Sequence, residues 1–179
     1  LPGGAVKRYN VKVSVFRQPA VELIHEAKVD MIRIHEFKSG ETAKTLKRFI
    51  NALIKAGKPI VVDLRYSPGG SLFEALDSVS LFLPPETPLI TLVDNADYRE
   101  PFSAVQGQVT HKLPTYLLMS PYTASSAEVF ALILKHYASA ILIGTRTQGK
   151  CLSQQLFDFE EGSALKLSVY DILGPDNRS

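Results

Sequence analysis

The sequence has few of the features that mark a disulfide-rich, membrane-spanning or nucleic-acid-binding protein. A single cysteine, Cys151, excludes an intrachain disulfide. No apolar run approaches the roughly 20 residues of a membrane-spanning helix, and the first residues do not have the pattern of a signal peptide. The 20 Lys and Arg nearly balance the 18 Asp and Glu, and this balance argues against a nucleic-acid partner.

The 179 residues do contain enough apolar sequence for one globular domain. Hydrophobic residues make up 45% of the chain and charged residues 21%, so it can fold around a core without a metal or a disulfide. Residues 1–10, with two glycines and a Lys-Arg pair, are expected to be a lead-in segment. The domain itself is expected to occupy residues 11–179.

Apolar periodicity predicts alternating strands and helices along this domain. Helices are expected over residues 41–54, 72–83 and 125–137. Strands are expected over residues 11–15, 31–37, 59–64, 89–93, 116–119, 141–143, 152–159 and 165–172, with residues 94–113 as a long loop or a weak hairpin. The succession of strand, helix and strand favours an α/β fold with right-handed crossovers, and the strand pairs at both ends favour a mixed sheet.

Three segments carry residues suited to chemistry, and the first of them joins a predicted strand to a predicted helix. It reads Asp63-Leu-Arg-Tyr-Ser-Pro-Gly-Gly70. Glycines at such a turn let backbone N–H groups approach a ligand closely, as an oxyanion hole requires. A turn that only needs the positive φ of glycine would have the same residues, so both interpretations stay open for this segment alone.

The second segment, Thr123-Ala-Ser-Ser-Ala-Glu128, opens a predicted helix. A serine at a helix N-terminus lies beside exposed N–H groups and the positive end of the helix dipole, which would suit a nucleophile. Ser125 followed three residues later by Glu128 also has the spacing of a capping box. A purely structural role therefore explains this segment as well.

The third segment, Gly144-Thr-Arg-Thr-Gln-Gly149-Lys150, has the spacing of a phosphate-binding loop. That interpretation is rejected, because Cys151 stands where a Ser or Thr should hold Mg²⁺ and because the following residues alternate like a strand. A lysine kept out of water releases its proton more easily, so Lys150 is a candidate general base. A solvated loop lysine is the structural alternative, and both interpretations stay open for this residue alone. The four histidines are scattered without metal-ligand spacing and offer no rival base.

Taken together, the three segments resemble the carboxyl-terminal processing proteases, also called tail-specific proteases, of the S41 serine peptidase family. They are similar to that family's Asp-Leu-Arg-x-Asn-Pro-Gly-Gly, Ser-Ala-Ser-Ala-Ser-Glu and Val-Gly-x-x-Thr-x-Gly-Lys elements. Their order and the spacing of 25 positions from Ser125 to Lys150 also agree with the family, over about residues 11 to 175. The sequence departs from the pattern at Ser67, Ser126 and Cys151, and none of these changes removes a catalytic group.

The resemblance implies a catalytic apparatus and a fold. Ser125 falls on the family's nucleophile, Lys150 on its base, and Gln154 on the residue that orients the base. The oxyanion hole would consist of backbone N–H groups from Gly69 or Gly70, together with that of Ser126. No metal and no cofactor is implied. The implied fold is a single-domain, layered α/β core of the ClpP and crotonase type, with a mixed sheet and flanking helices.

The resemblance also implies a substrate and a setting. The expected activity is an endopeptidase that forms an acyl-enzyme and cleaves proteins or peptides near an apolar C-terminal tail, in the periplasm or another extracytoplasmic compartment. Membrane association would occur through a part of the protein outside these residues. Family members carry a PDZ domain that captures the tail; residues 1–10 would be its trailing edge, and the core would be truncated at its C-terminus.

A function of a different class stays open beside this one. A core without a tail-binding domain could be catalytically silent and only hold extended peptides by strand addition. The oligomeric state is also left open, with a homo-oligomer among the options.

Overall fold

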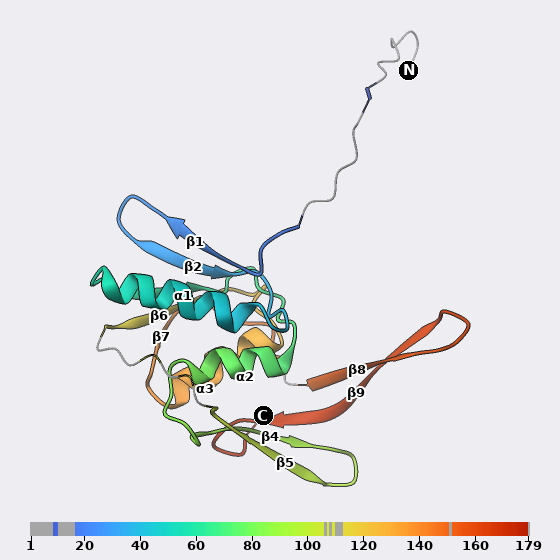
Figure 1. The fold of residues 1–179 in the computed structure, drawn as a ribbon. Helices are drawn as coiled ribbons and strands as arrows, with labels where there is room; N and C mark the ends of the chain where they lie inside the picture. The colour runs from blue at the N-terminus through green and yellow to red at the C-terminus, as the bar shows by residue number, and fades with distance from the viewer. Residues whose placement is uncertain are drawn as a thin grey trace.

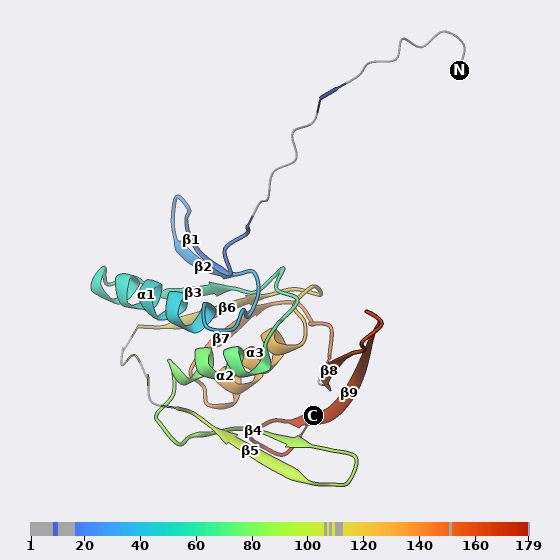
Figure 2. The same cartoon turned by 45° about the vertical axis from the view of Figure 1, so that its right-hand side comes forward.

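Two sheets enclose a layer of helices in the computed structural model, which describes residues 9–10, 17–105, 107, 109, 113–150 and 152–178. In Figures 1 and 2 the helices lie between the five-stranded sheet and the β4–β5 pair. The first sheet has the order β1-β2-β3-β6-β7, formed by Val21–His25, Asp30–Ile34, Ile60–Asp63, Thr115–Met119 and Ile141–Gly144. The second has the order β5-β4-β9-β8, formed by Arg99–Ser103, Pro88–Val93, Ala164–Leu173 and Leu152–Asp158.

The first sheet is mixed, as the sequence predicted. Strands β2, β3, β6 and β7 are parallel to one another, and β1 pairs antiparallel with β2. All four residues of β3 are buried, because helices connect the parallel strands and leave central strands little solvent contact. The carboxyl ends of β3, β6 and β7 are followed in the chain by the three motif segments.

The three predicted helices are present as α1 (Thr42–Lys55), α2 (Leu72–Ser80) and α3 (Ser126–His136). Each one buries an apolar stripe, such as Leu46, Ile50 and Leu53 of α1. The first turn of α1 contains no acidic residue. The buried carboxylate of Glu74 in α2 supplies the missing acceptor, since it receives the N–H groups of Gly40 at 2.7 Å and Ala43 at 2.8 Å.

The second sheet is where the structure departs from the predicted topology. β4 does not join the sheet of β3 as a strand–helix–strand unit would require, but pairs with β5 and β9. The polar segment after β4 contains β5, so the hairpin alternative for that segment is correct. The pair β8–β9 joins this second sheet and not the mixed one. Pairing between β4 and β9 joins residues about 80 positions apart, which local periodicity does not encode.

At the chain's amino-terminal side, the structure shows one strand that was not predicted and does not describe one that was. The structure adds β1, Val21–His25, which the sequence analysis did not predict because its apolar residues do not alternate cleanly. The strand predicted over residues 11–15 lies outside the described residues, as does Cys151.

β8 confirms that the segment ending at Lys150 leads into a strand, which excludes a phosphate-binding loop of the P-loop type. Together β8 and β9 form a long hairpin that extends away from the helices (Figure 1). Within the described residues, no helix combines the length and apolarity that crossing a bilayer demands.

Gly144, the last residue of β7, lets its backbone lie directly against the backbone of Met119. Its φ is +135°, and an added Cβ would clash with the carbonyl oxygen of Met119. We expect Gly144→Ala to lower the free energy of unfolding by more than about 3 kcal/mol, because a main-chain atom cannot move out of the way as the end of a flexible side chain can. Gly57→Ala is the matched control, because its φ is +66° and it has open space around it; it should cost about 1 kcal/mol. Equal losses in urea denaturation would contradict the expectation.

Candidate active site

One cavity of about 350 Å³ brings together residues from all three motif segments. Gly70 comes from the first segment, Ser125 and Ser126 from the second and Lys150 from the third, and Gln154 of β8 lines the same wall. Lys166 and Ile172 of β9 also line the cavity. Five of the six site residues that the sequence analysis named therefore share one cavity, and the sixth, Gly69, packs directly against Ser125.

Ser125 holds an unusual backbone conformation at the start of α3. It is the N-cap of this helix, with φ +55° and ψ −126°, a region that residues other than glycine rarely adopt. A serine on a sharp turn between a strand and a helix is the geometry of a nucleophile elbow, which exposes the hydroxyl. Its own N–H donates to Glu128 Oε2 at 2.8 Å.

The Pro68-Gly69-Gly70 turn fits against Ser125 because it has no side chains at its last two positions. A Cβ on Gly69 would lie 2.9 Å from Ser125 Cβ, and one on Gly70 would lie 2.5 Å from the Phe37 carbonyl oxygen. Both glycines have positive φ, +100° and +132°. The Gly69 carbonyl accepts the Phe37 N–H at 2.8 Å, which holds this turn in place.

Three backbone N–H groups next to Ser125 are free to bind a ligand. Within the described part of the chain, the N–H groups of Gly69, Gly70 and Ser126 donate to no other group. The Ser126 hydroxyl donates to the Gly70 carbonyl at 2.9 Å and joins the turn to the helix. Free N–H groups at a helix N-terminus and a glycine turn can stabilise a developing negative charge.

Lys150 meets the residue expected to orient it. Its Nζ donates to Gln154 Oε1 at 2.9 Å, and its side chain is half-buried at the cavity wall. Among the described residues, no carboxylate lies within ion-pair distance of this Nζ. The amide oxygen of Gln154 thus holds the amine at the cavity wall through one hydrogen bond.

Glu128 has a wider role than the capping function considered from the sequence. Its buried carboxylate accepts the N–H groups of Ser125 at 2.8 Å, Gly149 at 2.6 Å and Lys150 at 2.9 Å. Burial by itself raises the pKa of this carboxyl, but hydrogen bonds from the Thr147 side chain and from these backbone groups outweigh it and hold the pKa below its ordinary 4.5. Its position as the one charged residue in the apolar run 126–134 is the sequence signal that could have pointed to it.

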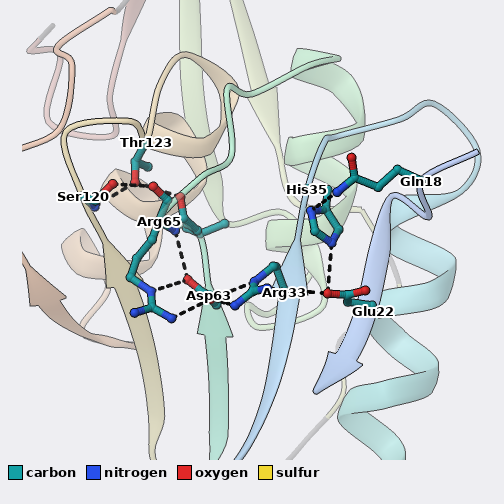
Figure 3. A network of polar contacts seen from close by, with 9 residues as sticks. Gln18, Glu22, Arg33, His35, Asp63, Arg65, Ser120 and Thr123 are labelled. Carbon is teal, nitrogen blue, oxygen red and sulfur yellow. Dashed lines mark hydrogen bonds and ion pairs between the residues drawn. The ribbon is translucent and has the colours of Figure 1, made fainter. Parts of the chain in front are cut away.

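A second buried carboxylate, Asp63, anchors the first motif segment (Figure 3). It accepts Arg65 Nε at 2.9 Å and Arg33 Nε at 3.0 Å. Burial raises the pKa of Asp63, but hydrogen bonds from the Arg65 side chain and N–H and from the Arg33 side chain outweigh burial and hold the pKa below its ordinary value. Beyond Asp63, the Thr123 hydroxyl donates to the Leu64 carbonyl at 2.8 Å. The segments before Gly69 and before Ser125 are therefore joined side by side.

The geometry can be compared with known protein families. The sequence profile of "Peptidase family S41" matches residues 28–179. The chain belongs to peptidase family S41. Members of this family are serine-type peptidases, which confirms the resemblance inferred from the motifs.

Curated members of the S41 family align with most of this chain. A carboxyl-terminal-processing protease of Picosynechococcus sp. is 35% identical over 143 residues, which cover 79% of this chain and 34% of that protein. A probable CtpA-like serine protease of Staphylococcus aureus is 31% identical over 176 residues, which cover 97% of this chain and 35% of that protein. The chain thus spans about a third of the length of these relatives.

Solved S41 structures agree with the fold. The photosystem II D1 C-terminal processing protease superposes with a TM-score of 0.75 at 26% identity, over 84% of this chain and 39% of that chain. A putative S41 protease from Bacteroides fragilis superposes with a TM-score of 0.74 at 23% identity, over 93% of this chain and 49% of that chain. The predicted layered α/β fold of this family is confirmed.

The charge of Glu128 gives a prediction for acid stability. Because its pKa is lower in the folded chain, the ionised group stabilises the fold above about pH 4.5, and this contribution is lost as the pH falls further. Glu128→Gln should lower the free energy of unfolding at pH 7 by about 1–3 kcal/mol. The difference from the unmodified chain should shrink as the pH falls below 4.5.

Urea denaturation at a series of pH values measures this difference. Glu26→Gln, at an exposed position, is the matched control and should change stability little at any pH. If the loss of unfolding free energy in Glu128→Gln stays constant from pH 7 to 3, the cause is altered packing or hydrogen-bond geometry and not the lost charge.

Proposed function

We propose that this chain is the catalytic core of a serine endopeptidase of the carboxyl-terminal processing type, with Ser125 as nucleophile and Lys150 as general base. The observation that supports it most is the strained Ser125, beside free N–H groups and in one cavity with Lys150. The names of the relatives support a cut near the C-terminus of a polypeptide. The apolar substrate tail and the extracytoplasmic setting follow from the family resemblance and belong to this proposal.

The reaction begins with the neutral amine of Lys150 accepting the proton of Ser125 Oγ as Oγ attacks the peptide carbonyl carbon. The carbonyl oxygen gains negative charge and receives hydrogen bonds from Ser126 N–H and from Gly69 or Gly70 N–H. The protonated Nζ then gives its proton to the leaving nitrogen, the C–N bond breaks, and an acyl-enzyme remains. Water then gives a proton to Lys150 Nζ and attacks the ester carbon. The C–Oγ bond breaks, Oγ takes this proton back from Nζ, and the carboxylic acid product leaves.

Two further residues position this machinery. Gln154 holds the Lys150 amine from one side through its amide oxygen, which leaves the lone pair of the neutral amine free to face Ser125. Glu128 acts through the backbone, since it fixes the N–H groups of Ser125 and Lys150 on one carboxylate. In such a mechanism a misplacement of the reacting atoms by about 1 Å can cost about a hundredfold in rate, and rigid backbone contacts guard against it.

The assignment of Ser125 is tested with a fluorophosphonate probe, which labels an activated serine. The unmodified chain should be labelled at one site and should cleave peptides. Ser125→Ala should lose both, with about 1 kcal/mol or less of lost stability, because the position is a helix N-cap. Ser139→Ala, at a position between α3 and β7 that does not line the cavity, is the matched control and should keep both. An unlabelled, inactive but folded chain would favour the silent peptide-binding core instead.

The pairing of Lys150 with Gln154 predicts a change in the pH profile. In Gln154→Glu a carboxylate replaces the amide 2.9 Å from Nζ and favours the charged lysine. The pH at which kcat/KM reaches half its maximum should rise by about one unit. Gln155→Glu, at the neighbouring exposed position of β8, adds the same charge and should leave the profile almost unmoved. Equal profiles for both variants would argue against Lys150 as the base.

A further inference from the structure

Two exposed tyrosines stand beside the catalytic cavity. Tyr66 and Tyr122 are 67% and 69% exposed, and their rings stack with centroids 5.9 Å apart and planes at 21°. Tyr66 lies between β3 and the Pro68-Gly69-Gly70 turn, and Tyr122 lies between β6 and Ser125. Large aromatic surfaces left open to water in a folded protein often mark a binding site.

These tyrosines form a groove that adjoins the cavity. The groove has a volume of about 410 Å³ and is lined by Tyr66, Pro68, Pro121, Tyr122, Ala124 and Gln148. Pro68 also lines the catalytic cavity, and Ala124 directly precedes Ser125. A peptide that lies across Ser125 can therefore extend over Pro68 into this groove.

The groove is built before any substrate arrives. The N–H of Ala124 donates to the Ser67 carbonyl at 3.1 Å, which joins the two segments that carry the rings. The Tyr122 N–H donates to the Ser120 hydroxyl at 3.1 Å, and that hydroxyl donates to the Arg65 carbonyl. Because these backbone contacts fix the positions of both tyrosines, binding loses less conformational entropy than it would on mobile loops.

The lining also defines the chemistry of the ligand. None of the six lining side chains is charged, and four of them are tyrosine or proline rings. Aromatic and proline surfaces bind flat apolar rings, as grooves for proline-rich peptides do. A charged side chain would lose its hydration here without gaining an ion pair.

We propose that this groove is a specificity subsite, in which Tyr66 and Tyr122 bind a proline or aromatic side chain of the polypeptide substrate near the scissile bond. The inference rests on the proposed peptidase function and adds a sequence preference to it. The tyrosines contribute binding energy and take no part in proton transfer, so their effect falls mainly on KM.

The test uses sets of fluorogenic peptides. Within a set, the peptides differ at a single position, which is phenylalanine, proline or glycine. The sets differ in where this position lies on either side of the cleaved bond. The unmodified chain should prefer a ring over glycine by about tenfold in kcat/KM at one of these positions. In Tyr66→Ala and Tyr122→Ala this ratio should fall toward one, mainly through a higher KM for the ring peptide. Tyr98→Ala, which removes a tyrosine that is 65% exposed in the turn between β4 and β5, is the matched control and should keep the ratio.

The outcomes separate this inference from the proposed function. Cleavage of every peptide with an unchanged ratio in both tyrosine variants would overturn the subsite and leave the peptidase intact. Absence of all cleavage would overturn the proposed function. Fluorescence anisotropy with a labelled phenylalanine or proline peptide would then test the groove by binding alone. Equal affinity of the unmodified chain and Tyr122→Ala for this peptide would overturn the subsite. If Tyr122→Ala changes the oligomeric state and leaves the kcat/KM ratio of ring peptide to glycine peptide unchanged, the groove is a contact between copies of the chain and the subsite is overturned.

Discussion

The buried carboxylate of Glu128 is the interaction on which the arrangement of this site depends. It receives backbone N–H groups from Ser125 and, more than twenty residues later in the chain, from Gly149 and Lys150. A buried carboxylate that lost these donors would be strongly unfavourable, so the two segments stay together wherever the fold is intact. Glu128 also lies in the first turn of α3, where the helix dipole favours a negative charge. The positions of the proposed nucleophile and base are thus set by main-chain contacts, and their side chains remain free for chemistry.

The second constraint is the contact between two backbones without intervening side chains. Gly69 lies against Ser125, and Gly70 lies against Phe37, so the turn can present free N–H groups next to the strained serine. The buried Asp63 with its two arginines holds the preceding strand end at the same place (Figure 3). One rigid pair of loops therefore supports both the proposed oxyanion hole and the tyrosine groove, and the strain at Ser125 is carried by these surroundings.

The second sheet completes the cavity from the other side. β8 begins almost directly after Lys150, so Gln154 reaches the amine within one short strand segment, and β9 adds Lys166 and Ile172 to the wall. β9 in turn is held by β4, far earlier in the chain. The cavity is therefore complete only when the antiparallel sheet has formed, although the three motif segments all follow strands of the mixed sheet.

The sequence by itself determined the helices and most strands, because periodicity is a local property of the chain. The six candidate site residues followed from its resemblance to the S41 family. The sequence also pointed to the family, since three weak motifs in the right order are specific together. Only the tertiary structure decided that β4 and β9 pair in a separate sheet, that Glu128 holds both halves of the site, and that Tyr66 and Tyr122 stack beside it. These features depend on which distant residues meet, and a pattern of neighbours along the chain carries no information on the partner that a buried charge or an exposed ring will find.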